Sequence, residues 1–129
     1  ANVTWITSEI TIPTRRADNR PFFRQPGKIA NVTLFYEKGR FSGRIAWNYA
    51  DAQLYTLGSS ALGDIYRVPR RQYDLQLRYR ISSHYSITGS VRNLTREPER
   101  FVYGPANSGL IRTSRLLDRD YKVGISVNY

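Results

Sequence analysis

The chain has 129 residues, a length that normally makes one domain, and a mean hydropathy of −0.52; it contains no run of the roughly 18–20 apolar residues that a membrane-spanning helix needs. It has no cysteine and no methionine, which excludes disulfides and thiolate metal sites. Lys and Arg outnumber Asp and Glu by 20 to 10, but they are spread along the chain, so we expect no nucleic-acid partner. The chain starts at Ala1 without a signal peptide, and we interpret it as a mature or excised piece.

Strand-like segments dominate the chain in sequence order. The opening "NVTWITSEITIP" is strand-like in residue type, although its two faces are indistinct. Five later segments place a large apolar residue at every second position, the pattern of a strand with two unlike faces. These are residues 30–37, 41–49, 73–81, 85–92 and 121–129. Only Phe35 breaks the alternation by adding an aromatic ring to the polar side. The sequence therefore predicts an all-β fold, an antiparallel up-and-down meander of about six strands.

The connections between these segments alternate between long and short. Residues 37–40 and 82–84 form tight turns, whereas 13–28, 51–70 and 97–117 are long and rich in Pro, Gly, Ser and Arg. Such a meander collects the long loops at one end and the tight turns at the other, which is typical of outer-membrane barrels. The pieces "QLYTLG" and "DIYRVP", which flank "SSALG", predict a hairpin that rises beyond the barrel wall.

The two predicted faces differ in chemistry. On the apolar face, aromatic residues lie near the strand ends and Val, Leu and Ile lie between them, as in the aromatic girdles of a lipid-facing wall; the simpler explanation is that Tyr favours strands. The polar face is interpreted as lumen-facing, although a one-sided sheet in water would show the same periodicity. The lumen-facing candidates are Asn31, Glu37, Arg44, Asn48, Asp74, Arg78, Arg80 and Arg92.

Six strands are too few to close a barrel, since single-chain barrels of this type start at about eight. An alternative is therefore a self-contained small β-barrel or a soluble all-β ligand-binding protein, for which residues 51–70 would have to supply two wall strands. Otherwise the chain is part of a larger barrel, transmembrane and closed by strands outside this sequence.

Two long stretches, "KIANVTLFYEKGRFSGRIAWNYAD" and "YDLQLRYRISSHYSITGSVRNLTREPERFVYG", precede the aromatic-terminated "YKVGISVNY". Their order and spacing, with the loop "PFFRQPG" before them, resemble the C-terminal β-barrel portion of a TonB-dependent outer-membrane receptor. The resemblance covers about residues 26–129. It implies a bacterial outer-membrane location and a barrel of about 22 strands around a plug domain.

The same resemblance implies active transport. Such receptors import ferric siderophores, cobalamin or oligosaccharides with energy from the TonB complex, which contacts a TonB box in the N-terminal part. This chain lacks the plug, the TonB box and the earlier strands, so no import activity is assigned to these residues alone. The expected partners are outer-membrane lipid and lipopolysaccharide, the remaining strands and plug of the same receptor, the TonB complex and the barrel-assembly machinery.

Two sets of residues are candidate sites. Arginines of the long loops are candidates for contact with an anionic ligand or lipopolysaccharide phosphate, a solvated loop surface being the simpler alternative: Arg15, Arg16, Arg20, Arg67, Arg70 and Arg71. From the family, the closing strand resembles the signal read by the barrel-assembly machinery, with the residues Tyr121, Val123, Ile125, Val127 and Tyr129.

No enzyme or cofactor is expected. His84 is the only histidine and falls in a predicted turn, so neither a histidine-based triad nor a zinc site can form from this chain's own residues. The carboxylate pairs Asp118/Asp120 and Glu97/Glu99 lie in loops without an activating environment. We expect no catalytic residue and no bound metal.

Overall fold

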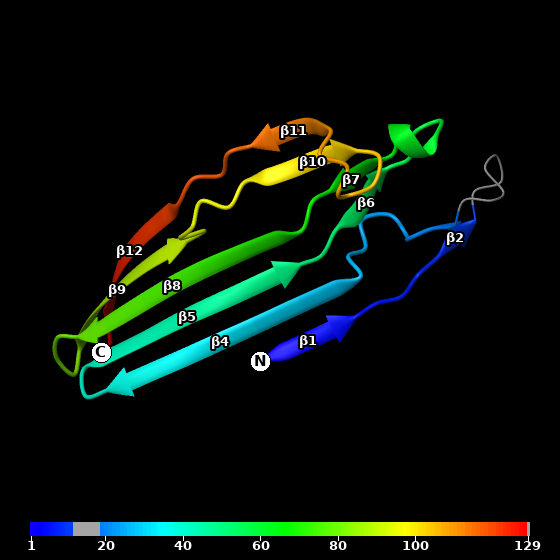
Figure 1. Ribbon diagram of the computed structural model, residues 1–129. Coiled ribbons are helices and arrows are strands. Elements are labelled where there is room, and N and C mark those ends of the chain that lie inside the picture. Colours follow the sequence, from blue (N-terminus) through cyan, green and yellow to red (C-terminus); the bar gives the residue numbers. More distant parts are fainter. Residues whose placement is uncertain (12–18, 129) are drawn as a thin grey trace.

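The computed structural model describes residues 1–11 and 19–128, which form antiparallel strands with no α-helix among them (Figure 1). One of the loops in the described ranges contains a 3-10 turn, Ala61–Gly63. The strands are β1 (Asn2–Trp5), β2 (Ile10–Thr11), β3 (Asn19–Arg20), β4 (Lys28–Lys38), β5 (Phe41–Ala50), β6 (Gln53–Thr56), β7 (Ile65–Arg67), β8 (Arg70–Arg80), β9 (Tyr85–Arg92), β10 (Glu99–Tyr103), β11 (Ile111–Arg115) and β12 (Asp120–Val127).

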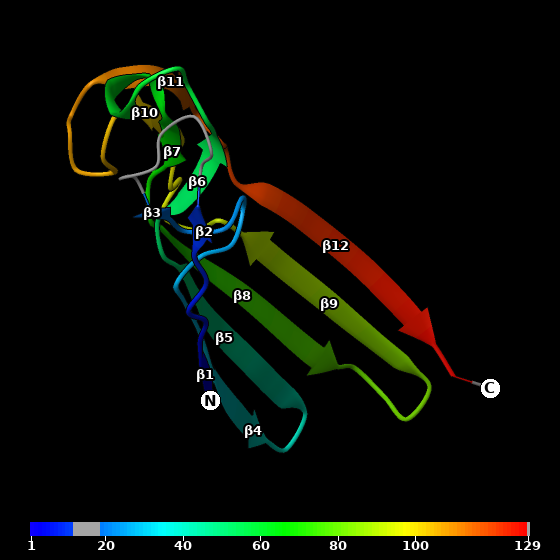
Figure 2. The ribbon, with the colours of Figure 1, turned by 90° about the vertical axis from the view of Figure 1, so that its right-hand side faces the viewer.

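The main element is a six-stranded sheet in the order β1-β4-β5-β8-β9-β12, with each strand antiparallel to its neighbours. This confirms the predicted meander. The sheet does not close on itself, and β1 and β12 are its edges among the described strands (Figure 2). The tight turns after β4 and β8 lie at one end, and the long connections leave from the other.

The opening segment was predicted as one strand, and this was wrong. Residues 2–5 pair with β4 as β1, and the chain then leaves the sheet after Ile6, whose N–H donates to the Gly27 carbonyl at 2.9 Å. Ile10 and Thr11 instead pair with β3 in a separate two-stranded ladder. The polar run Thr7-Ser8-Glu9 between them offers no apolar face to hold against the sheet, which explains the break.

A second sheet of four strands, in the order β11-β10-β7-β6, prolongs the first (Figure 1). It consists of two hairpins, in which β6 and β7 follow β5 and precede β8, while β10 and β11 follow β9 and precede β12. The predicted hairpin in 51–70 is therefore confirmed, and its strands lie outside the six-stranded sheet. The hairpin within 97–117, which we expected to be only a connection, was missed.

The buried apolar side chains gather in this second sheet rather than in the long one. Leu54, Ile65, Phe101 and Val102 are buried there, and the rings of Tyr55 and Phe101 pack edge to face with centroids 4.8 Å apart. The connection before β4 closes over them, because the Arg24 N–H donates to the Leu54 carbonyl at 2.7 Å and the Arg24 guanidinium lies 4.9 Å from the Tyr55 ring. Among the described residues, no second sheet packs against the face of the long sheet. In the described part of the long sheet, Ala30 is the only residue that is both apolar and buried.

Asn93 joins the second hairpin to the long sheet. Its side-chain amide donates to the carbonyls of Leu117, at 2.9 Å, and Glu97, at 3.4 Å, and its side-chain oxygen accepts from the Glu97 N–H at 2.9 Å. Asn93 is buried and has a φ of +54°, a left-handed conformation that asparagine tolerates better than most residues. One side chain therefore holds the exit of β9 beside the approach to β12.

We expect Asn93→Ala to lower the free energy of unfolding by about 1–3 kcal/mol, because it leaves buried backbone groups without partners and strains the left-handed backbone. Asn93→Gly removes the same hydrogen bonds, but glycine adopts a positive φ without strain. It should therefore lower the free energy of unfolding less than Asn93→Ala does. Urea unfolding in detergent, followed by tryptophan fluorescence, measures both. Asn107→Ala, at an exposed loop position, is the matched control, and equal effects at residues 93 and 107 would contradict this role.

Candidate functional site

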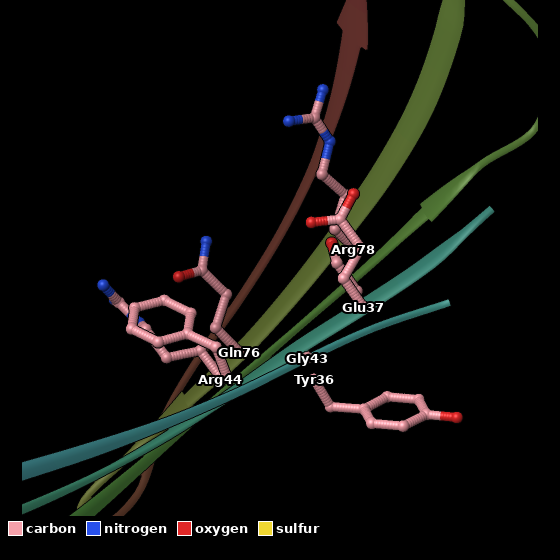
Figure 3. Close-up of a pocket in the computed structure, with 8 residues that line it drawn as sticks. Tyr36, Glu37, Gly43, Arg44, Gln76 and Arg78 are labelled. Atoms are coloured by element: carbon pink, nitrogen blue, oxygen red, sulfur yellow. The ribbon is translucent and has the colours of Figure 1, made fainter. Parts of the chain in front are cut away.

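The strand register places every alternate side chain of the long sheet on one of two opposite faces. Residues that oppose each other in antiparallel pairs share a face, as Val32, Trp47 and Tyr73 do across β4, β5 and β8. Figure 3 shows the separation, with Tyr36 projecting from one side and Glu37, Arg44, Gln76 and Arg78 from the other.

The apolar face is continuous over all six strands. It carries Val3, Trp5, Ala30, Val32, Leu34, Tyr36, Phe41, Ile45, Trp47, Tyr49, Tyr73, Leu75, Leu77, Tyr79, Tyr85, Ile87, Val91, Tyr121, Val123, Ile125 and Val127. Aromatic residues predominate toward its two ends, where Lys28, Lys38 and Arg71 also lie, and aliphatic residues occupy its middle. At the loop end, the rings of Trp47 and Tyr49 stack with centroids 6.0 Å apart; at the turn end, those of Tyr36 and Phe41 lie 6.3 Å apart.

Little of this face is covered within the described chain. Leu34 remains 65% exposed, Ile125 70% and Val123 82%. Isolated exposed apolar residues are ordinary, but a continuous apolar surface of this extent marks a place where protein or lipid binds.

The eight lumen-facing candidates lie together on the opposite, polar face. Asn31 opposes Asn48, Arg44 opposes Gln76, and Asp74 opposes Ala46. Likewise Glu37 and Arg78 both oppose Ser42, Arg80 opposes Ser86, and Arg92 opposes Asp120. The residues share a face as the alternation predicted; whether this face lines a lumen stays a prediction.

Asp74 is the most extensively hydrogen-bonded carboxylate of the polar face. It accepts from the Gln72 side chain at 2.8 Å, from the Asn48 side chain at 3.4 Å and from the Asn93 N–H at 3.0 Å. Its oxygens are therefore occupied by neutral amide donors, and none of the ion pairs found among the described residues includes it.

The basic residues of this face are correspondingly poorly neutralised. Arg78 donates to the Ser86 hydroxyl, from Nε at 3.2 Å and from Nη2 at 3.0 Å, rather than to a carboxylate. Arg44, Arg80 and Arg92 take part in no ion pair within the described part of the chain. Lys122 pairs with Asp120 on its own strand, at 3.7 Å.

Three open depressions follow one another across the polar face. The first, of about 130 Å³, is lined by Arg40, Arg78 and Arg80 near the tight turns. The second, of about 190 Å³, has Glu37, Arg44 and Arg78 among its lining residues (Figure 3). The third, of about 250 Å³, has Arg44, Asp74, Arg92 and Lys122. Sequence reasoning missed Lys122 and Arg40, although the alternation of the last strand already puts Lys122 on the polar face.

The loop arginines do not form one cluster in the described part of the structure. Arg20 lies against the buried Asp64, with Nε 3.4 Å from a carboxylate oxygen, and Arg67 pairs with Glu99 at 3.1 Å. Arg70 and Arg71 fall on opposite faces of β8, since they oppose Ala50 and Tyr49. A depression of about 210 Å³ brings together only Arg67 and Arg70, beside Asn31, Asn48 and Gln72. Arg15 and Arg16 lie outside the described residues.

The closing strand β12 forms one edge of the long sheet. Tyr121, Val123, Ile125 and Val127 lie on the apolar face, opposite Val91, Gly89, Ile87 and Tyr85, whereas Tyr129 is outside the described residues. The Asn128 N–H donates to the His84 carbonyl at 2.8 Å, which holds the end of the strand beside the turn.

Neither the search for metal-binding clusters and membrane-spanning helices nor the comparison with known proteins identifies a further feature of this site. No group of three or more His, Cys, Asp or Glu residues in the described ranges could hold a metal ion, and no helix there is long and apolar enough to cross a membrane. The His84 ring nitrogen lies 2.9 Å from the neighbouring Ser83 hydroxyl in the turn. No family model, no curated protein and no solved structure matches the chain.

We expect Asp74→Ala to lower the free energy of unfolding by about 1–3 kcal/mol, because three donors lose their common acceptor. Asp74→Asn keeps one acceptor oxygen and should lose less. Asp120→Ala, at an exposed position on the same face, is the control. Urea titration of the four proteins checks the order, and an equal loss from Asp74→Ala and Asp120→Ala would show that Asp74 organises nothing.

Proposed function

We propose that this chain forms a six-strand wall segment of a TonB-dependent outer-membrane transporter, an active-transport receptor for a scarce nutrient. The observation that carries the proposal is the uncovered apolar face, with aliphatic residues across its middle and aromatic residues along both ends. A bilayer accommodates this arrangement, since hydrocarbon meets the aliphatic band and the headgroup regions meet the aromatic side chains.

Strand length and loop placement support the same function. β4 and β8 have 11 residues each and β5 has 10, close to the roughly 9–11 residues of a tilted membrane-spanning strand. The hairpins stand at the end from which the long connections leave, and in the proposal this end is extracellular. Tight turns then face the periplasm.

The two open edges define what the segment needs from the rest of the receptor. Unpaired backbone groups of β1 and β12 cannot face hydrocarbon, so in a bilayer each edge has to pair with another strand. The proposal assigns these strands, the plug and the TonB-coupling segment to the remainder of the receptor. The same unpaired edge makes β12 the strand through which assembly machinery would engage the chain.

The second candidate function is a small self-contained barrel or a soluble all-β binding protein. A closed barrel of eight strands would require β6 and β7 in the wall, but they belong to the other sheet. A soluble sheet would need a second layer over the apolar face. Both features favour the transporter segment. The imported nutrient is proposed only as a class: a ferric siderophore, cobalamin or an oligosaccharide.

Ile125→Lys tests the proposal against its soluble alternative. Ile125 is 70% exposed in the described chain, so a sheet in water would lose little from this change. A lipid-facing lysine near the bilayer centre costs about 2–4 kcal/mol. We therefore expect Ile125→Lys, introduced into the full receptor that contains this chain, to reduce insertion into phosphatidylcholine vesicles strongly, measured by the protected fraction after protease treatment.

Ser126→Lys is the matched control, because the neighbouring side chain of the same strand is also exposed but lies on the polar face. The receptor with Ser126→Lys should insert as the unchanged receptor does. Equal insertion of both lysine variants would refute a lipid-facing role for the apolar face.

A further inference from the structure

We propose that the polar face of the long sheet is a binding track for small soluble oxyanions that carry two or more negative groups, such as polycarboxylates. As a route for substrate, the track rests on the transporter function proposed above. As a binding site, it rests on the arrangement of basic side chains alone.

The first step of the argument is position. Arg44 opposes Gln76, so Arg78 is its diagonal neighbour on the next strand, about 7–8 Å away between backbones. Arg80 follows Arg78 two residues along β8, about 7 Å further. Arg92 lies two strands from Arg44 and two residues along, about 12 Å away. The guanidinium groups thus form a series from the turn end to the loop end.

The second step is concavity. The three depressions of the polar face share walls: Arg78 borders the first and the second, and Arg44 borders the second and the third. Between the cations, the Gln76 amide and the Ser90 hydroxyl border the third depression and offer neutral donors to carboxylate or phosphate oxygens. A ligand that leaves one depression therefore meets a basic side chain already shared with the next.

The third step is charge. The carboxylates on this face are too few to cancel its cations, since Glu37, Asp74 and Asp120 stand against six basic residues: Arg44, Arg70, Arg78, Arg80, Arg92 and Lys122. Asp74 accepts hydrogen bonds from amide groups rather than pairing with an arginine, and Asp120 pairs with Lys122. Glu37 forms none of the ion pairs found in the described ranges, and it faces two depressions bordered by arginines. Planar guanidinium groups match the geometry of carboxylates and phosphates, which makes anions the complementary ligands.

The concave, discontinuous form of the track favours a small ligand over an extended acidic polypeptide. Each depression holds a volume of about 130–250 Å³, and the side chains of Phe35 and Gln76 stand at the second one. An extended chain would need a continuous groove or a free backbone edge, whereas a small polyanion needs only two neighbouring cations.

The test uses the full chain in an uncharged detergent at low salt, with citrate as the probe and calorimetry as the measurement. Arg44 and Arg92 are exposed, so Arg44→Gln/Arg92→Gln should keep the strand content in circular dichroism. We expect this double variant to bind citrate about tenfold or more weakly, as follows from losing charged hydrogen bonds. Inorganic phosphate should follow the same order, and glycerol should not bind.

Lys38→Gln/Arg71→Gln is the matched control, because it removes the same charge from the same sheet but on the apolar face. An equal weakening in the control, or no citrate binding by the unchanged chain, would overturn the track. Binding of a glutamate-rich peptide without binding of citrate would also overturn it, in favour of a polypeptide partner. Vesicle insertion, tested with Ile125→Lys, is a separate readout, so failure of the track and failure of the transporter proposal remain distinguishable.

Discussion

The strand register of the long sheet is the constraint on which the other features depend. If β5 slipped by one residue against β8, the side chains of β5 would change faces. Ile45 would then lie on the polar side of the sheet and Arg44 on the apolar side. The middle strand β5 pairs along its length with β4 and β8, and at Gly43 the Leu77 side chain lies 3.4 Å from the position that a Cβ would occupy. Register therefore fixes the aliphatic band, the aromatic ends and the series of arginines at once.

The alternation of apolar and polar residues predicted this sheet because most of its strands have two unlike faces. The hairpin of β10 and β11 shows where that reasoning ends. Phe101 and Val102 are adjacent and both buried, so the chain there has no polar face and no period of two. The short strand β10 also lies between Pro98 and the pair Gly104-Pro105, which made the region resemble a plain loop. A strand covered on both sides leaves no periodic signal in the sequence.

The candidate site likewise has features that the residue spacing predicts and features that it does not. The shared face of Arg44, Arg78 and Arg92 followed from spacing alone, and the opposite placement of Arg70 and Arg71 would have followed too, had the strand been predicted to begin at residue 70. The hydrogen-bond partners of the polar residues did not follow from the spacing. The sequence does not predict that Asp74 is held by amides rather than arginines, because its donors are two side chains, of Asn48 and Gln72, and the N–H of Asn93, a residue with positive φ. Spacing determines faces, whereas contacts depend on loop geometry.

The two faces of the long sheet need different surroundings to be stable, one apolar and one polar. The hairpins need neither, because they bury apolar residues of their own. Apart from Ala30, the described chain keeps its buried apolar residues in the second sheet, so the long sheet would derive most of its apolar burial from a partner that covers its face. Arginines without carboxylate partners repel one another and would be costly in a dry enclosure, so the polar face requires water or anions against it. Under the proposed function, lipid satisfies the first demand, and the wet lumen around the plug satisfies the second. The selectivity of that lumen would then follow from the unneutralised arginines rather than from the fold.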